Sequence, residues 1–175
     1  MVHGMNDPQC TQDEPLLDNP FWQFSLTVYQ QPNCADFLLD AQNRYGIDIN
    51  VLLFIGWLAH EQKSLKLSPM FKSTINDFQQ GTIAPIRKIR IAVKKMKNAE
   101  FYEALKRLEL LAENLEQQRL YRLFDQMPVS DEDFNVSIEQ SINVYIGQND
   151  KGVALIQEKN WLQTLIQYLQ PDTRL

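Results

Sequence analysis

Apolar residues recur along most of the chain at the three- and four-residue spacing of amphipathic helices. In segment 33–45, Phe37, Leu38 and Ala41 fall on one face, and Tyr45 follows one turn later. Segment 49–62 is apolar almost all round between residues 51 and 59, which is typical of the buried central helix of a bundle.

The longest periodic segment runs from 98 to 127 and carries a stripe with spacing 4, 3, 4, 3. The stripe consists of Phe101, Leu105, Leu108, Ala112 and Leu115. This repeat predicts a long helix with a buried seam. A last helix is expected to carry Leu155, Leu162, Leu165, Ile166 and Leu169.

Capping residues and helix breakers give the boundaries of these segments. The predicted starts are Asn19-Pro20, Asp48, Ser68-Pro69, Thr82, Asn98 and Ser130 with Asp133. The predicted ends are Gly46, Gly81, Pro128 and Gly147, and a turn is expected at 149–152.

Segment 19–31 is the one ambiguous stretch. Trp22, Phe24, Leu26 and Val28 alternate with polar residues as in a strand. No other segment alternates in this way, and an unpaired strand would leave its backbone groups unsatisfied. We therefore predict a helix here, and an all-α, single-domain helical bundle of about seven or eight helices over 19–175, preceded by a polar tail at 1–18.

Composition adds several exclusions. The chain has 175 residues, with two cysteines, Cys10 and Cys34, and two histidines. Neither a disulfide framework nor a structural zinc site is expected from so few ligands. The first twenty residues hold four acids and no Lys or Arg, unlike a signal peptide, and no apolar run is long enough for a membrane span. A cytoplasmic protein is expected.

Charge is arranged in blocks that the net value of −5 conceals. Residues 1–62 carry −7, residues 63–97 carry +8 and residues 98–175 carry −6. The basic cluster in segment 83–97 comprises Arg87, Lys88, Arg90, Lys94, Lys95 and Lys97. On a helical wheel Ile86, Ile89, Val93 and Met96 share one arc, and the cations cover most of the rest.

Two interpretations of this basic helix stay open. Its cations can be neutralised by the acidic flanks of the same chain when it folds. They can also face solvent and bind an anionic partner, either an acidic protein surface or the phosphates of RNA. RNA binding of this kind would be weak and independent of sequence, because the helix offers no aromatic residue for stacking.

Several acidic motifs are examined and rejected as metal sites, and no metal or cofactor is expected. Asp36 and Asp40 have the DxxxD spacing used by all-α diphosphate enzymes, but no second acidic cluster faces them in the sequence. Residues 131–142 follow a calcium-loop spacing, with Val136 and Ile142 in place of the required Gly and Glu. Cys34 lies near a helix start, where a thiolate would be favoured.

A longer sequence motif resembles that of a known protein family. The chain reads FWQFSLTVYQQP at 21–32, then YGIDIN at 45–50, LLF at 52–54 and WLA at 57–59. In this it resembles a proteobacterial domain-of-unknown-function family of conserved hypothetical proteins, most clearly over 20–60. The resemblance implies a bacterial cytoplasmic protein and no particular activity.

The large residues of that motif are expected to pack the first helices. Trp22, Asn50 and Trp57 are the alternative, as the lining of a ligand pocket or partner groove. Gly56, unfavourable inside a helix, indicates a close helix contact or ligand approach. We therefore expect a non-catalytic interaction or regulatory protein with an unknown protein partner. The alternatives are an RNA- or ribosome-associated binder that uses the basic helix 83–97 and an enzyme of unrecognised class, and the protein can also form a homodimer.

Overall fold

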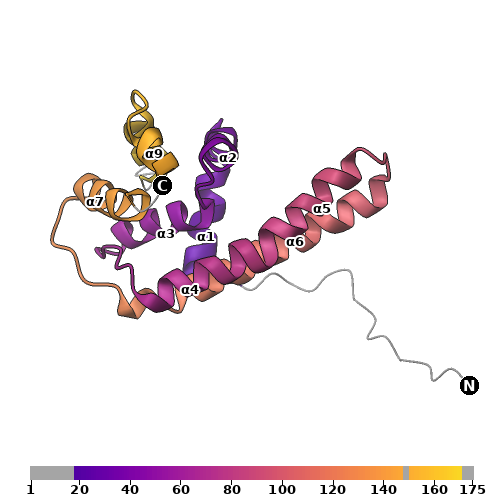
Figure 1. Cartoon of the computed structure of the whole chain (residues 1–175). Coiled ribbons are helices and arrows are strands. Elements are labelled where there is room, and N and C mark those ends of the chain that lie inside the picture. Colours follow the sequence, from indigo (N-terminus) through magenta and orange to yellow (C-terminus); the bar gives the residue numbers. More distant parts are fainter. Residues whose placement is uncertain (1–17, 148–149, 171–175) are drawn as a thin grey trace, which may run out of the picture.

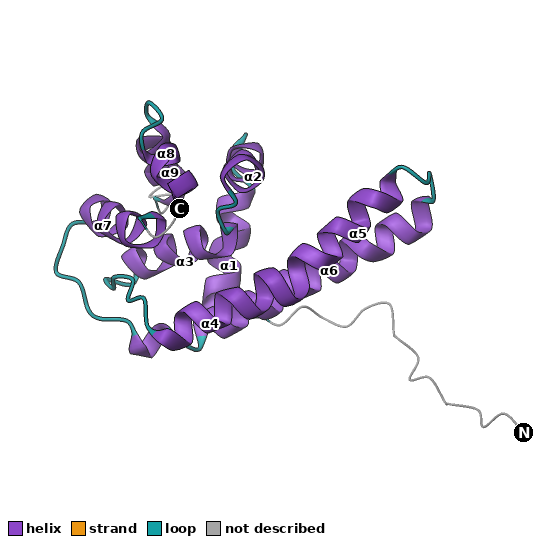
Figure 2. Cartoon of the chain, viewed as in Figure 1, coloured by secondary structure: helices purple, strands orange, loops and turns teal. Residues whose placement is uncertain are grey.

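The computed structural model describes residues 18–147 and 150–170, and every secondary-structure element named in them is a helix (Figure 2). In chain order they are α1 (Pro20–Tyr29), α2 (Cys34–Tyr45), α3 (Ile49–His60), α4 (Pro69–Phe78), the π-helical segment η1 (Gln79–Ile83), α5 (Ala84–Lys94), α6 (Ala99–Tyr121), the 3₁₀ turn η2 (Phe124–Gln126), α7 (Phe134–Ile146), α8 (Asp150–Ile156) and α9 (Trp161–Leu169). The all-α prediction is confirmed, and 19–31 is helical. The expected tail lies outside these residues, apart from Asp18.

α3 is the centre of the core, as its uniformly apolar sequence predicts. Every residue from Ile49 to Ala59 is buried. Phe54 packs edge-on against Phe21 of α1, with ring centroids 5.3 Å apart, and stacks on Phe71 of α4 at 6.3 Å. A Cβ added at Gly56 would lie 2.7 Å from Leu169 Cδ2. The glycine therefore allows α9 to approach α3, which confirms the predicted close contact.

Local capping chemistry accounts for most of the helix starts. The side chains of Asn19, Asp48, Ser68 and Asn98 each accept a hydrogen bond from a backbone N–H in the first turn of α1, α3, α4 and α6. Such bonds satisfy N–H groups that have no partner within the helix. α7 is capped by Asp133, and Ser130 lies outside that helix.

Several predicted boundaries are wrong. α6 ends at Tyr121 and is followed by the 3₁₀ turn η2, so the helix does not continue to Pro128. Gly81 and Thr82 do not separate two helices, because α4 passes through η1 directly into α5. The wider π turn absorbs the glycine without a break in the helix. The expected last helix is instead split into α8 and α9, and Asn160 adopts a left-handed conformation, φ 65°, between them. Asp150–Gly152 belong to α8 and not to a turn.

α4, η1 and α5 form one long rod that lies alongside α6, and the far end of this pair projects from the rest of the molecule (Figure 1). We call residues 84–115, which are α5, the turn after it and the part of α6 beside it, the arm. Helices α1–α3 and α7–α9 are called the body. No helix in the described residues has both the length and the apolar character needed to cross a membrane.

The expected buried seam of α6 is only partly correct. Leu105 and Ala112 are buried, but Phe101 and Leu108 are each 48% exposed and Leu115 is 40% exposed. On α5 the predicted apolar arc is divided in the same way: Val93 is buried, and Ile89 is exposed. α5 and α6 contact each other along one side only. About half of each apolar stripe therefore lies outside this contact and faces solvent.

Candidate functional site

The basic cluster of the sequence divides into two groups on the arm. Arg87 and Arg90 point toward α6 and pair with its acids. The Arg87 Nε–H donates to Glu109 Oε1 at 2.7 Å, and Arg87 also lies 3.1 Å from Glu113 Oε1. Arg90 forms a second ion pair with Glu109. These two arginines are therefore neutralised within the chain.

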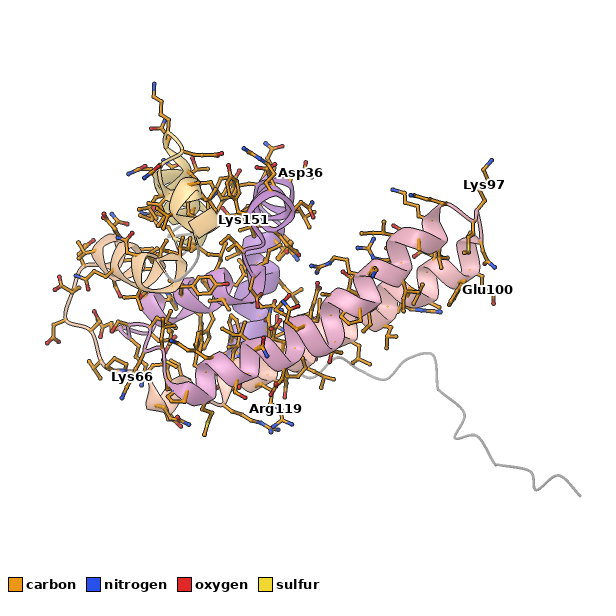
Figure 3. The ribbon with its side chains drawn as sticks, in the orientation of Figure 1. Asp36, Lys66, Lys97, Glu100, Arg119 and Lys151 are labelled. Atoms are coloured by element: carbon orange, nitrogen blue, oxygen red, sulfur yellow. The ribbon has the colours of Figure 1, made fainter. Side chains whose placement is uncertain are left out.

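The other four cations, Lys88, Lys94, Lys95 and Lys97, are exposed. None of them forms an ion pair in the part of the chain that the structure describes. Lys97 and Glu100 both lie at the outer tip of the arm (Figure 3). The arm thus carries free positive charge on the surface away from its salt bridges.

A cavity of about 290 Å³ lies where the base of the arm meets the body. Its lining comes from α1, α2, the start of α3, η1, α5 and α6. The lining residues are Trp22, Ser25, Leu26, Tyr29, Gln42, Asp48, Ile49, Asn50, Gln79, Arg87, Leu110, Glu113 and Gln117. This volume is near the lower end of the range for small-molecule sites.

A chain of buried polar side chains forms one wall of this cavity. The Asn50 side-chain amide donates to Glu116 Oε2 at 2.6 Å and accepts from Gln117 Nε2 at 2.8 Å. Ser25 in turn donates to Gln117 Oε1 at 3.0 Å, and Gln79 donates to Glu116 at 3.2 Å. We call Ser25, Asp48, Asn50, Gln79, Glu116 and Gln117 the acid–amide cluster.

The local structure around Asp48 and Gln79 explains how these two members of the cluster are positioned. Asp48 is fixed as the cap of α3, where its Oδ1 accepts from the Asn50 N–H at 2.9 Å. Its own N–H donates to the Tyr145 hydroxyl at 3.1 Å. Gln79 begins the π segment, a feature often found at functional sites. The cluster therefore joins the body to η1 and to the part of α6 that follows the arm.

Two carboxyl groups of the cluster influence each other. Burial raises the pKa of Glu116 to about 9, and the nearby charge of Asp48 adds to this shift. Burial also raises the pKa of Asp48, against hydrogen bonds that lower it. The pair consequently retains a proton near neutral pH. Asp48 is 6% exposed, and its Oδ2 has no hydrogen-bond partner within the described residues.

Acids on the arm side of the cavity respond differently to their surroundings. Burial raises the pKa of Glu113 to about 7, although the charge of Arg87 opposes the shift. Burial also acts to raise the pKa of Glu109, but hydrogen bonds from Arg90 and Arg87 lower it overall. Glu109 is thus held as a charged partner of two arginines, and Glu113 titrates beside the cavity.

The three predicted pocket residues are not together. Trp22 and Asn50 line the cavity, whereas Trp57 packs in the body against Phe24 and Phe124, with ring centroids 6.0 and 6.1 Å away. Sequence reasoning did not identify Gln79, Glu116 and Gln117 as site residues. The sequence did hold one signal for them: acids and amides occur within the predicted apolar seam of α6. Such residues are rarely buried without a partner, so their presence there indicates a polar cluster.

Positions considered for metal or thiol chemistry lie elsewhere. Asp36 and Asp40 are exposed on α2, and Asp40 pairs with Arg44 at 2.9 Å. Within the described residues no group of three or more His, Cys, Asp or Glu side chains is arranged to hold a metal ion. The expected favoured thiolate at Cys34 is wrong, because burial raises its pKa to about 11.

Comparison with known proteins gives one match. The model of a family described as "Protein of unknown function (DUF2390)" matches residues 20–120, which is more than half of the chain. No curated protein and no solved structure matches. The matched segment holds α1 to α6 and every residue that lines the cavity. On this match the chain belongs to the DUF2390 family of proteins of unknown function.

Proposed function

We propose that this protein is a non-catalytic interaction protein whose arm binds an acidic, amphipathic helix of a protein partner. The observation that carries the proposal is the outward half-stripe of the arm, next to four exposed cations that form no ion pair with any described residue. The proposal includes a bacterial, cytoplasmic setting, which the resemblance over residues 20–60 supports.

Five exposed apolar residues of the arm fall on one side of it. Phe101, Leu108 and Leu115 are spaced seven apart on α6 and therefore share one face. Ile89 and Met96 have the same spacing on α5 and the turn after it, and Met96 is 72% exposed. Each set lies about a quarter turn from the contact between α5 and α6, and the antiparallel direction of the two helices brings both sets to the same side. We call these five residues the outer stripe.

A third helix is the natural occupant of such a surface. It would lie in the groove between α5 and α6 and cover the outer stripe on both sides, as in a three-helix bundle. Exposed apolar patches rimmed by charged residues mark interaction sites in soluble proteins. The outer stripe has this form, because Lys88 and Lys95 lie on the neighbouring face of α5.

Charge indicates the chemistry of the occupant. The arm holds eight Lys or Arg residues and four acids. Two copies of it would repel each other, which disfavours a homodimer formed through this surface. An acidic helix would instead complement Lys88, Lys94, Lys95 and Lys97.

The test uses a synthetic helix as the probe. It is an amphipathic peptide of about 18 residues, long enough to span the arm at 1.5 Å per residue, with Leu on one face and Glu on the others. Fluorescence anisotropy at low salt measures its binding to the full chain. A scrambled peptide of the same composition is the probe control. We expect saturable binding of the amphipathic peptide alone.

Two variants separate the apolar and charged contributions. Phe101→Glu with Leu108→Glu removes the outer stripe, and Leu39→Glu on α2, whose leucine is 43% exposed, is the matched control. Lys88→Glu with Lys95→Glu reverses the charge, and Lys66→Glu, at an exposed position in the loop between α3 and α4, is its control. Each double variant should weaken binding about tenfold or more, and each control should leave it unchanged. Equal binding by either double variant would contradict the proposal.

RNA and a second copy of the chain are competing outcomes of the same experiment. A single-stranded RNA oligonucleotide that binds more tightly than the peptide, and that depends on Lys88 and Lys95 but not on Phe101, would replace the protein partner with RNA. Self-association lost with Phe101→Glu would replace it with a homodimer. Arg87 and Arg90 are left unchanged, because they are internal partners of Glu109.

A further inference from the structure

Asp48 and Glu116 bring two carboxyl groups into contact inside the protein. Asp48 is 6% exposed and Glu116 is completely buried, and their side chains lie within hydrogen-bond reach of each other. Two ionised carboxylates are both acceptors, so a hydrogen bond between them needs a proton on one of the two. The contact therefore implies that the pair shares a proton.

Neutral donors occupy the other oxygens of the pair. Asp48 Oδ1 accepts from the Asn50 N–H at 2.9 Å, and Glu116 Oε2 accepts from the Asn50 side-chain amide at 2.6 Å. Gln79 Nε2 donates to Glu116 at 3.2 Å. Asp48 Oδ2 has no hydrogen-bond partner in the described part of the chain. A proton held between this oxygen and Glu116 would satisfy an acceptor that is otherwise costly to bury.

No described cation neutralises the pair, because neither carboxyl forms an ion pair with a described residue. Asn50 of α3 and Gln79 of η1 contribute amides. The ionisable groups that act on the pair from the other helices around it are Tyr29 of α1, Glu113 of α6 and Tyr145 of α7. Arg87 of α5 is itself paired with Glu113. Loss of the shared proton would leave two adjacent negative charges in a site of low dielectric, where they repel each other strongly.

The pair lies where three parts of the fold meet. Asp48 caps the start of α3, and Glu116 belongs to α6, one residue beyond the arm. Gln79 begins η1, the π-helical segment between α4 and α5. Gln117, next to Glu116, bonds to Ser25 of α1. Repulsion between the two carboxyls would therefore act on the contacts that hold α6 against α1 and α3.

We propose that Asp48 and Glu116 form a proton-dependent latch between α3 and α6 at the base of the arm. With the shared proton in place the latch is closed, and η1 and α6 lie against the start of α3. Loss of the proton opens the latch and exposes the wall of the cavity. Burial and the charge of Asp48 raise the pKa of Glu116, so the latch is closed at neutral pH and opens as the pH rises. This device does not depend on the function proposed for the arm.

Methyl NMR of the full chain, labelled with ¹³C at the isoleucine δ1 carbons and recorded from pH 6 to 10, tests the latch. Ile49 is the first residue of α3 and Ile83 is the last residue of η1, so their methyl groups report on its two sides. Ile138 is buried in α7 and reports on the rest of the core. We expect Ile49 and Ile83 to shift together in a single-proton step with a midpoint well above neutral pH, while Ile138 stays unchanged.

Two amide variants replace the shared proton permanently. In Asp48→Asn the new N–H group can donate to Glu116, and in Glu116→Gln it can donate to Asp48. Asn also caps helices well. Each variant should therefore keep the latch closed, and the pH step at Ile49 and Ile83 should disappear. Glu113→Gln is the control, because it removes a nearby acid of the cavity lining that does not belong to the pair. The step should remain in this control.

Three kinds of result would overturn the proposal. A wild-type chain without the step up to pH 10 would show that no proton controls this joint. A step that is retained in a folded amide variant, or lost in Glu113→Gln, would assign the titration to another group. A step that includes Ile138 and a loss of far-UV circular dichroism would mean that the chain unfolds as a whole. If an amide variant does not fold, the wild-type titration and the Glu113→Gln control decide.

Discussion

α3 and the arm are stabilised by different interactions. In α3 eleven consecutive residues are buried, and the helix is covered by α1, α6, α7 and α9. In the arm, α5 and α6 cover each other on one side only, and Glu109 is buried between Arg87 and Arg90. The body is therefore stabilised mainly by removal of apolar surface from water. The arm relies on a few apolar contacts and a network of charges.

The contrast shows that an apolar repeat does not by itself identify a core. The stripe on α6 is as regular as any in the chain, yet three of its five members are largely exposed. Whether a stripe is buried depends on how many helices surround it. An exposed stripe, as on the arm, is available for binding a partner, whereas a buried stripe is used in folding.

Removal of a central aromatic ring should have the largest effect. Phe54→Ala deletes a fully buried side chain that contacts Phe21 and Phe71. Truncations of this kind cost about 3–5 kcal/mol, and we expect a loss of that size in urea unfolding. Phe101→Ala on the arm is the comparison and should cost under about 1 kcal/mol. Equal losses would contradict the distinction between body and arm.

The charge network of the arm should give the next largest effect. Glu109→Gln leaves Arg90 without a charged partner and Arg87 with Glu113 alone, in a site where both arginine side chains are about one-fifth exposed. Breaking a buried pair costs about 3–5 kcal/mol, and partial exposure reduces our expectation to about 1–3 kcal/mol. Circular dichroism during urea unfolding measures the change. Glu103→Gln, in an exposed pair with Lys106, should change it by under about 0.5 kcal/mol.

Two glycines should respond with opposite signs. Gly56→Ala brings a methyl group against Leu169, and overpacking of this kind should outweigh the better helix propensity and cost about 1 kcal/mol. Gly81→Ala in η1 meets no atom within 4 Å, so it should stabilise by about 0.5 kcal/mol. Thermal midpoints of the two variants would decide. A stabilising Gly56→Ala would show that α9 is not closely packed on α3.

The acid–amide cluster should make stability depend on pH in a predictable direction. The pKa of Glu116 is raised in the folded chain from 4.5 to about 9, so unfolding releases a proton between those values. Stability from this group is greatest below about pH 4.5 and is lost as pH rises toward 9, by at most about 1.4 kcal/mol per pH unit. Urea unfolding of Glu116→Gln from pH 5 to 9 should show a flatter dependence than the wild type. An unchanged slope would mean that Glu116 is not the group responsible.

Local signals in the sequence were sufficient to predict the fold class and most of the helix starts. Asn19, Asp48, Ser68 and Asn98 cap helices through bonds that span at most three residues, and these are readable without tertiary structure. The continuous passage of α4 into α5 was not predicted, because a glycine such as Gly81 commonly marks the end of a helix when only the local sequence is considered. Here the packing of the rod against α6 keeps the backbone helical through a π turn.

The candidate site was harder to predict, since its members are distant in sequence. Asn50 and Glu116 are 66 residues apart, and Ser25 and Gln117 are 92 apart. Asp48 was recognised as a helix cap, but its burial beside Glu116 depends on the position of η1 and α6. Trp22 and Asn50 could be proposed from side-chain type. Trp57 shows why type alone does not distinguish a pocket residue from a core residue.

Native-state hydrogen exchange measures the difference between body and arm directly. Amides of α3 should exchange only through global unfolding, because the whole helix is buried. Those of α5 and the outer half of α6 should exchange through a local opening of lower free energy. Glu109→Gln should lower protection in the arm and leave α3 at the global value. Equal protection of α3 and the arm in the wild type, lost together in the variant, would contradict the view that charges hold the arm separately from the apolar core.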